Sequence, residues 1–448
     1  MSAPRRVFVQ AFGCQMNVLD GEIVLGELAR EGWQVTYDRS EADLVIFNTC
    51  SVRAHSENKV WSHLGALREK KRARPDLLIG VMGCMAQRTG EEILDRMPHV
   101  DIVCGTRRFD EFPAFVRRAA ESGERTLALN PETPDFTAPH REVGVRPVRH
   151  RAFVAVMRGC DHRCTYCIVP ATRGAEISRP VADVVDEVRR LRDDGVREVT
   201  LLGQNINTYG KQLPGSPSLV DLLIALDALD GIDRVRFITS NPMDLEPALL
   251  EAMGSLASAC EYLHFPAQSG NDRVLRRMGR LYTVDRYREL AALARRKVPG
   301  IELSSDFIVG FPGETEQEFE DTMSLVREIE LQNIYVFKYS VRPDTAATHF
   351  DDDVPEEEKR RRNNALLALQ LTISERRNAA LVGTTQEVLV DGPSKTDASR
   401  LAGRTRTDRI VIADGLTECA IGRLVPIRIE SATALCLYGV PADPAAVT

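Results

Sequence analysis

Short apolar runs separated by longer segments of helical spacing fill about the first 120 residues. Four of these runs are predicted β-strands, at residues 7–11, 44–47, 77–82 and 101–103. Strands that are apolar at nearly every position are buried on both faces, which is typical of a parallel sheet covered by helices. We therefore expect an α/β fold whose first domain, residues 5–125, is a doubly wound parallel sheet of flavodoxin-like or Rossmann-like type.

A second region, from about residue 151 to 345, repeats a strand followed by a helix six times. The strands are predicted to end near Gly159, Gly203, Ser240, Gln268, Gly310 and Ser340. Six sequential units predict a partial (β/α)6 barrel with its active site at the carboxyl ends of the strands. Residues 130–150 are rich in Pro, Arg and His without periodicity, and we interpret them as a linker.

The last third of the chain changes pattern twice. Leu and Ile recur at helical spacing among charges over residues 356–377, which predicts a solvated amphipathic helix that connects two domains. Short β-like runs follow at 386–390, 409–412, 425–429 and 434–438, divided by Gly, Pro and Asp. This spacing predicts a small β-barrel over residues 381–443, after a barrel domain over 146–380.

Composition narrows the class of protein only slightly. The chain has 448 residues with a net charge of -7, so any site for nucleic acid must be a local basic patch. No apolar run approaches the roughly 20 residues that span a bilayer, and residues 1–6 lead into a strand-like run without the apolar stretch of a signal peptide. We therefore expect a cytoplasmic protein with no membrane partner, most simply a monomer.

The densest cysteine cluster lies at the end of the first barrel strand. Cys160, Cys164 and Cys167 have C-x3-C-x2-C spacing on one loop. Three thiolates can each bind one iron of a 4Fe–4S cluster and leave the fourth iron open. An open iron suits S-adenosylmethionine, whose amino and carboxylate groups can chelate it. A zinc site is the alternative, but such sites usually have four ligands and are closed.

Three further cysteines follow predicted strands of the first domain: Cys14, Cys50 and Cys84. The carboxyl ends of parallel strands meet at one edge of a sheet, where such folds gather their ligands. These thiols can therefore converge, although three buried structural cysteines would give the same pattern. We interpret Cys104 as structural, and the dispersed Cys260, Cys419 and Cys436 as core residues.

The cysteine loop resembles that of the radical S-adenosylmethionine (SAM) superfamily, and residues 307–314 resemble the strand that lies against the adenine in that superfamily. The resemblance implies a catalytic cluster on Cys160, Cys164 and Cys167. It also implies SAM as a cofactor, bound by Tyr166 at the adenine, by Gln204 at the methionine part, and by the segment containing Gly310 and Glu314.

The segments 11–17, 48–51 and 82–84 resemble the N-terminal domain of radical SAM methylthiotransferases. The resemblance implies that Cys14, Cys50 and Cys84 hold an auxiliary 4Fe–4S cluster where sulfur binds before its insertion, so that the chain carries two clusters. The C-terminal region resembles a TRAM domain, an RNA-binding β-barrel. Its candidate phosphate contacts are Arg400, Arg404, Arg406 and Arg409, although ordinary solvated arginines remain the alternative.

Methylthiotransferases of this kind act on isopentenyladenosine in tRNA, on threonylcarbamoyladenosine in tRNA, or on an aspartate of a small-subunit ribosomal protein. Residues 48–53, 164–167, 202–205 and 353–360 are similar to the first branch. That branch implies a tRNA anticodon arm carrying isopentenyladenosine as substrate, and two uses of SAM per turnover. It also implies an electron donor of flavodoxin or ferredoxin type and an iron–sulfur carrier.

Two other classes of protein remain open from the residues alone. A two-cluster electron-transfer protein would need four ligands for each cluster, and the two groups of three cysteines argue against it. A non-catalytic RNA-binding module would need neither the cysteine loop nor residues 307–314.

Overall fold

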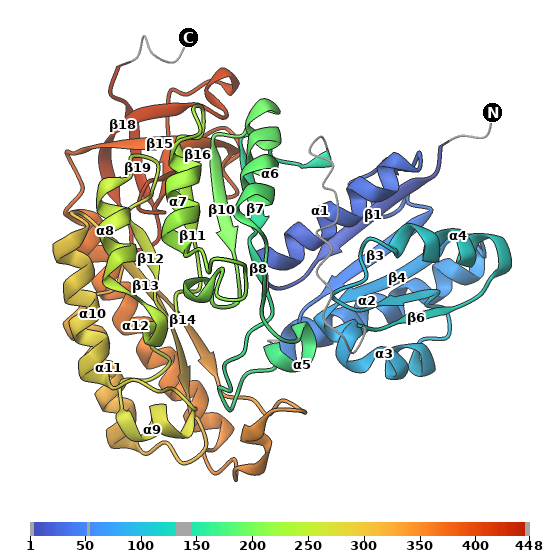
Figure 1. Cartoon of the computed structure of the whole chain (residues 1–448), viewed down its shortest axis with the longest axis horizontal. Coiled ribbons are helices and arrows are strands. Elements are labelled where there is room, and N and C mark those ends of the chain that lie inside the picture. Colours follow the sequence, from blue (N-terminus) through green and yellow to red (C-terminus); the bar gives the residue numbers. More distant parts are fainter. Residues whose placement is uncertain (1–3, 52–53, 131–144, 444–448) are drawn as a thin grey trace.

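The computed structural model describes residues 4–51, 54–130 and 145–443, without the side chains of residues 54 and 55. Figure 1 shows an N-terminal domain in blue beside a central barrel, with the C-terminal strands in red at one end of that barrel. Most of the expected linker, and positions 52 and 53 of the motif 48–53, lie outside the described residues.

The N-terminal domain is built on a six-stranded, wholly parallel sheet with the order β2-β1-β3-β4-β5-β6. The strands are β1 (Arg6–Ala11), β2 (Gln34–Val35), β3 (Leu44–Thr49), β4 (Leu78–Gly83), β5 (Ile102–Cys104) and β6 (Thr126–Ala128). The sequence pattern missed β2 and β6, because two or three residues are too short a run to show periodicity. β6 lies just beyond the expected domain boundary at residue 125.

Helices cover both faces of this sheet. α1 (Gln15–Arg30) and α4 (Phe112–Ser122) share one apolar core with the strands, and α2 (Ala54–Ala73) and α3 (Cys84–Arg96) share the other. The expected doubly wound fold is confirmed. α1 also packs outward: Met16, Leu19 and Ile23 contact Ala155 and Leu202 of the central barrel.

The central domain contains six parallel strands in two sheets, β11-β10-β7 and β12-β13-β14, joined by one bridge between Val235 and Ala259. The six strands are β7 (Arg151–Ala155), β10 (Glu198–Leu202), β11 (Arg234–Phe237), β12 (Tyr262–His264), β13 (Glu302–Val309) and β14 (Asn333–Lys338). A small antiparallel pair, β8 (Met157–Arg158) and β9 (Ile177–Ser178), lies beside the cysteine loop. The predicted partial (β/α)6 barrel is therefore confirmed.

One layer of helices encloses this barrel around a continuous apolar core. The helices are α6 (Val181–Asp193), α7 (Leu219–Asp227), α8 (Pro247–Ser255), α9 (Asp272–Arg277), α10 (Val284–Lys297) and α11 (Glu316–Ile329). The short α5 (Val169–Arg173) lies against α3 of the N-terminal domain instead. Several begin at side-chain caps: Ser218 and Thr315 each form a capping box, which satisfies backbone N–H groups that the helix leaves free.

α12 (Glu356–Ala379) differs from the solvated connector that its charges predicted. The helix packs on β14 and buries Leu366 and Ile373 together with polar residues such as Arg362 and Gln370. The Gln370 amide donates 2.9 Å to the Leu331 carbonyl, so the polar inner face of the helix bonds to the backbone of the central domain. A half-polar inner face weakens apolar periodicity, which is why the sequence pattern suggested a solvated helix.

The C-terminal domain is a closed five-stranded barrel with the order β15-β16-β17-β19-β18. Its strands are β15 (Thr385–Pro393), β16 (Leu401–Thr405), β17 (Ile410–Ala413), β18 (Leu424–Ala432) and β19 (Leu437–Pro441). The expected small β-barrel is confirmed. The sequence analysis missed β16, whose centre is Gly403. A Cβ at this position would lie 2.2 Å from the Leu389 carbonyl oxygen, so glycine permits close pairing with β15.

The C-terminal barrel docks on the amino ends of the central strands, opposite the cysteine loop. Arg234, the first residue of β11, is fully buried and donates 2.8 Å to the Arg404 carbonyl and 3.0 Å to the Glu387 carbonyl. Arg236 donates 2.6 Å to the carbonyls of both Thr405 and Arg406. The turn between β16 and β17 therefore closes the floor of the central barrel.

We predict that Arg234→Met destabilises the protein by about 3–5 kcal/mol, because it leaves buried carbonyls and charges without their partner. Arg428→Met is the matched control, since its ion pair with Glu430 is exposed, and we expect a loss below about 1 kcal/mol. Urea denaturation followed by circular dichroism measures both free energies of unfolding. Equal losses in the two variants would show that the floor contacts do not stabilise the fold.

Candidate active site

The three N-terminal cysteines follow neighbouring strands and come together at the carboxyl edge of the sheet. Cys14 caps α1 after β1, Cys50 follows β3, and Cys84 begins α3 after β4. Gly13 has φ +104°, and a Cβ there would lie 2.7 Å from Sγ of Cys50. Gly83 has φ +96°, and its Cβ would lie 2.4 Å from Oδ1 of Asn48. Glycine thus lets the three loops approach closely.

Polar groups of the central domain complete the surroundings of this triad. Arg173 at the end of α5 donates 2.9 Å to Oδ1 of Asn17 and 3.1 Å to Oδ2 of Asp20. Crowded protein surroundings raise the pKa of the Cys14 thiol, although the residue remains accessible to solvent, and the charge of Arg173 opposes this shift. The site is therefore shared between two domains.

Backbone contacts hold the loop of Cys160, Cys164 and Cys167 in place. The Thr165 amide donates 2.9 Å to the Met278 carbonyl, and the Cys160 amide donates 3.2 Å to the Gly174 carbonyl. Burial raises the pKa of the Cys160 thiol to about 11 and that of Cys167 to about 12. A bound metal would have to stabilise the thiolates of these two residues, as metal ligation does.

A polar network fixes the outer side of the same loop. Nε2 of His162 lies 2.6 Å from Oδ2 of Asp244, and the Asn205 amide donates 2.8 Å to that same oxygen. Burial tends to raise the pKa of Asp244, but the hydrogen bonds from His162 and Asn205 lower it overall. The network joins the cysteine loop to the carboxyl ends of β10 and β11.

A cavity of about 580 Å³ opens beside the cysteine loop. Tyr166 and Cys167 line it on the loop side, and Asp306 and Ile308 of β13 line the opposite wall. Arg342, which is 9% exposed, lines it after β14 and lies 3.8 Å from Glu57 of α2. Arg342 thus joins the wall of the cavity to the N-terminal domain.

The four residues expected to contact SAM occupy different places. Tyr166 lines the cavity. Gln204 accepts a 2.6 Å hydrogen bond from the Gly159 amide and so supports the cysteine loop. Glu314 is buried, accepts a 2.6 Å bond from the Gly310 amide and pairs with Arg362 at 2.8 Å. Gly310 and Glu314 thus shape the turn after β13 against α12, and a direct contact between these two residues and SAM stays a prediction.

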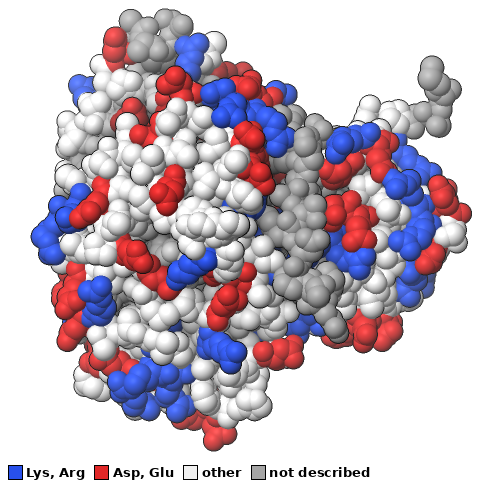
Figure 2. Space-filling view, viewed as in Figure 1, with Lys and Arg blue, Asp and Glu red and all other residues white. Residues whose placement is uncertain are grey.

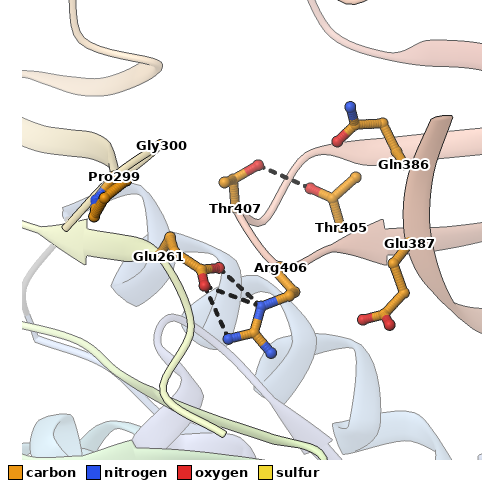
Figure 3. A pocket seen from close by; sticks show the side chains of 8 residues that line it. All are labelled: Glu261, Pro299, Gly300, Gln386, Glu387, Thr405, Arg406 and Thr407. Carbon is orange, nitrogen blue, oxygen red and sulfur yellow. Dashed lines mark hydrogen bonds and ion pairs between the residues drawn. The ribbon is translucent and has the colours of Figure 1, made fainter. Parts of the chain in front are cut away.

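The four candidate RNA-binding arginines do not form one outward-facing patch. Figure 3 shows the Arg406 guanidinium turned toward Glu261, 2.8 Å away, beside a pocket of about 250 Å³ under the central barrel. Arg409 is 6% exposed and pairs with Glu302 at 2.9 Å. Arg404 pairs with Asp408, and Arg400 with Asp414. Arg406 and Arg409 thus hold the C-terminal barrel to the central one.

Opposite charges alternate over the surface. On the face in Figure 2, basic and acidic side chains are interspersed across both the N-terminal domain and the central body. This distribution agrees with the net charge of -7. Among the described residues, no helix is long and apolar enough to cross a membrane.

The remaining cysteines divide between core and surface. Cys104 and Cys260 are buried, and burial raises the pKa of the Cys260 thiol to about 11. Cys419 is exposed and Cys436 half-buried, so the expectation that both are core residues is wrong for Cys419. It sits in a short 3-10 turn between β17 and β18, where an apolar residue need not point inward.

The two cysteine triads fit iron–sulfur clusters better than single ions. Within residues 4–51, 54–130 and 145–443, no three Cys, His, Asp or Glu side chains meet closely enough to hold one metal ion. Cluster ligands are spaced more widely, because each thiolate binds a separate iron. Buried polar atoms without partners surround the N-terminal triad, namely Oδ1 of Asn48, Oγ of Ser51 and Nη1 of Arg173. Such atoms are expected around a polar group held between the loops.

Three parts of the chain match known families in the same order as the three domains. Residues 6–105 match the uncharacterized protein family UPF0004, residues 154–326 the radical SAM superfamily, and residues 379–441 the TRAM domain. With the cysteine loop at the carboxyl end of a partial barrel, these matches define a radical SAM enzyme that carries an added N-terminal domain and a TRAM barrel.

Curated relatives resemble the whole chain. The tRNA-2-methylthio-N(6)-dimethylallyladenosine synthase of Carboxydothermus hydrogenoformans is 43% identical, over 98% of this chain and 99% of its own length. The enzyme of that name from Geobacter metallireducens is 45% identical, over 96% of each chain. The chain therefore belongs to the family of tRNA-2-methylthio-N(6)-dimethylallyladenosine synthases, which confirms the resemblance found in its motifs.

Solved structures share the fold at low identity. The radical SAM methyltransferase TsrM from Kitasatospora setae, with cobalamin and a 4Fe–4S cluster bound, aligns with a TM-score of 0.58 and 16% identity. The alignment covers 77% of this chain and 74% of TsrM. This likeness concerns the fold alone.

We predict that replacing Cys14, Cys50 and Cys84 together by Ala lowers the iron content by about four atoms per chain, as does replacing Cys160, Cys164 and Cys167. Iron analysis and visible absorption of the reconstituted proteins measure the loss. Cys104→Ala is the control, since its buried thiol lies outside both triads and should leave the iron content unchanged. Full iron in a folded first-triad variant would contradict a second cluster.

Proposed function

We propose that this protein converts isopentenyladenosine beside the anticodon of tRNA to its 2-methylthio derivative by radical SAM chemistry. The observation that supports this most directly is identity of 40–45% over nearly the full length with synthases of that name, combined with both cysteine triads. Cys160, Cys164 and Cys167 would hold the catalytic 4Fe–4S cluster, and Cys14, Cys50 and Cys84 the auxiliary one. When bound and reduced, the catalytic cluster supplies the electron that cleaves SAM to a 5′-deoxyadenosyl radical.

The protein's own residues orient the reactants and exclude water. Tyr166 would pack on the adenine of SAM, since its ring lines the cavity beside Cys167. Ile308 and Val336 give the cavity apolar walls, which protects a radical from side reactions with solvent. Arg342, which also lines the cavity, can bind a phosphate of a nucleotide that enters it.

The target nucleotide would have to leave the stacked anticodon loop to reach this cavity. Sequence-specific recognition of RNA usually splays out loop bases in this way. Carbon 2 of adenine carries no readily ionised proton, so radical abstraction is reasonable where a general base would fail. We further propose a cytoplasmic monomer that receives electrons from a flavodoxin or ferredoxin and its clusters from an iron–sulfur carrier.

Nucleoside mass spectrometry tests the substrate. In tRNA from cells that lack this gene, isopentenyladenosine should accumulate without its methylthio group, while threonylcarbamoyladenosine chemistry continues. The purified protein should also produce 5′-deoxyadenosine from SAM under anaerobic, reducing conditions. Unchanged methylthiolation of isopentenyladenosine in these cells would exclude the proposed branch, and absence of 5′-deoxyadenosine would exclude the enzyme class.

The contacts of the TRAM barrel yield a second prediction about tRNA binding. Arg400 pairs with Asp414 at the surface, where an ion pair is weak and a phosphate can replace it. Arg400→Ala should therefore weaken tRNA binding and lower the slope of log K against log salt by about one. Arg409→Ala is the matched comparison. It removes a buried contact with Glu302, so it should lower stability and leave the slope unchanged. An unchanged slope in Arg400→Ala together with a lower slope in Arg409→Ala would contradict these two roles.

A further inference from the structure

Arg173 is a buried cation at the junction of the two cysteine groups. It ends α5, the short helix that follows Cys167, and its side chain reaches into the N-terminal domain. The residue is 4% exposed. Nη2 donates to Asn17 and to Asp20, which leaves Nη1 without a hydrogen-bond partner in the described protein.

The guanidinium lies beside the N-terminal thiols, because Oδ1 of Asn17, which it binds, is 3.9 Å from Sγ of Cys14. Burial tends to lower the pKa of the Arg173 guanidinium, but the charges of Cys84, Asp20 and Cys14 raise it overall. A buried N–H without an acceptor costs about 1–3 kcal/mol. A fold retains such a group where the missing acceptor is part of the functional site, and sulfur atoms held by Cys14 and Cys84 would supply it.

We propose that Arg173 is a positioning residue of the N-terminal cysteine triad, whose guanidinium donates a hydrogen bond and a positive charge to the sulfur atoms gathered there. This inference rests on the two-cluster function proposed above. Hydrogen bonds to sulfur, net charge and solvent exposure set the reduction potential of an iron–sulfur cluster. The guanidinium therefore stabilises the more negative, reduced state and raises the potential of the auxiliary cluster.

Other arginines also join the two domains, so the role of Arg173 toward sulfur can be separated from its role in the domain interface. One of its oxygens binds Arg173 and the other binds Arg158 at 2.6 Å, so a second guanidinium serves the same carboxylate. Arg107 crosses the same interface, where it donates 3.0 Å to the Arg173 carbonyl and 2.7 Å to the Ala175 carbonyl. Among the described residues, the side chain of Arg107 bonds backbone carbonyls and no cysteine, so its loss weakens the interface without removing a donor to sulfur.

The test uses the full-length chain with Cys160, Cys164 and Cys167 replaced by Ala, so that only the auxiliary cluster remains. In this background we would titrate the cluster electrochemically with Arg173 intact and in Arg173→Met, Arg173→Lys and Arg107→Met. We expect Arg173→Met to lower the ratio of reduced to oxidised cluster at fixed potential at least tenfold, equivalent to about 59 mV for one electron. Arg173→Lys, which keeps the charge, should recover part of this shift, and Arg107→Met should cause none.

Two results would overturn the proposal. One is an Arg173→Met variant with full iron and an unchanged potential, and the other is an equal shift in Arg107→Met. If Arg173→Met loses its iron, retention of the cluster in Arg173→Lys supports the role of the charge, and loss in Arg107→Met as well refutes it. A background chain that binds no iron even with Arg173 intact would instead refute the two-cluster function itself.

Discussion

The structure depends on one buried carboxylate, Asp20, held between two guanidiniums of another domain. Its side chain is fully buried, and those of Arg158 and Arg173 are 6% and 4% exposed. Removing one partner of such a group leaves an uncompensated charge in the protein interior, which is strongly destabilising. The three side chains therefore favour the one arrangement of the two domains that keeps them paired. Arg158 directly precedes the cysteine loop and Asp20 lies in the helix whose N-cap residue is Cys14, so this contact ties the two triads to each other.

The same contact explains why two parallel sheets can share one reaction site. Each sheet gathers its cysteines at its carboxyl edge, as parallel α/β folds generally do. Docking joins these edges face to face, and Met16, Leu19 and Ile23 of α1 seal the junction with apolar contacts. The cavity beside Tyr166 is lined by the central domain, and its residue Arg342 reaches Glu57 of the N-terminal domain at 3.8 Å.

The sequence predicted what is local and repetitive, and missed what depends on docking. Strand–helix alternation indicated the first two domains and short β runs the third, and strand-end positions placed Cys14, Cys50 and Cys84 on the same edge of the sheet. The sequence did not predict the burial of Arg173, because a single arginine after a cysteine loop is expected to be exposed. Only the structure shows that Asp20 lies beside it. The ion pairs of Arg406 and Arg409 were missed for the same reason: their partners Glu261 and Glu302 belong to a distant part of the chain. The polar residues on the inner face of α12 are likewise explained only by the packing of this helix on the central domain, whose backbone they bond.

The docking of the C-terminal barrel on the floor of the central barrel has a consequence for the size of the substrate. The floor and the cavity lie at opposite ends of strands such as β13, whose eight residues extend over about 25 Å. A free nucleoside is far shorter than this and can occupy only one end. A molecule that engages both must be a long, shaped object such as an RNA arm. The separation of the two ends therefore sets the minimum length of any substrate that contacts both.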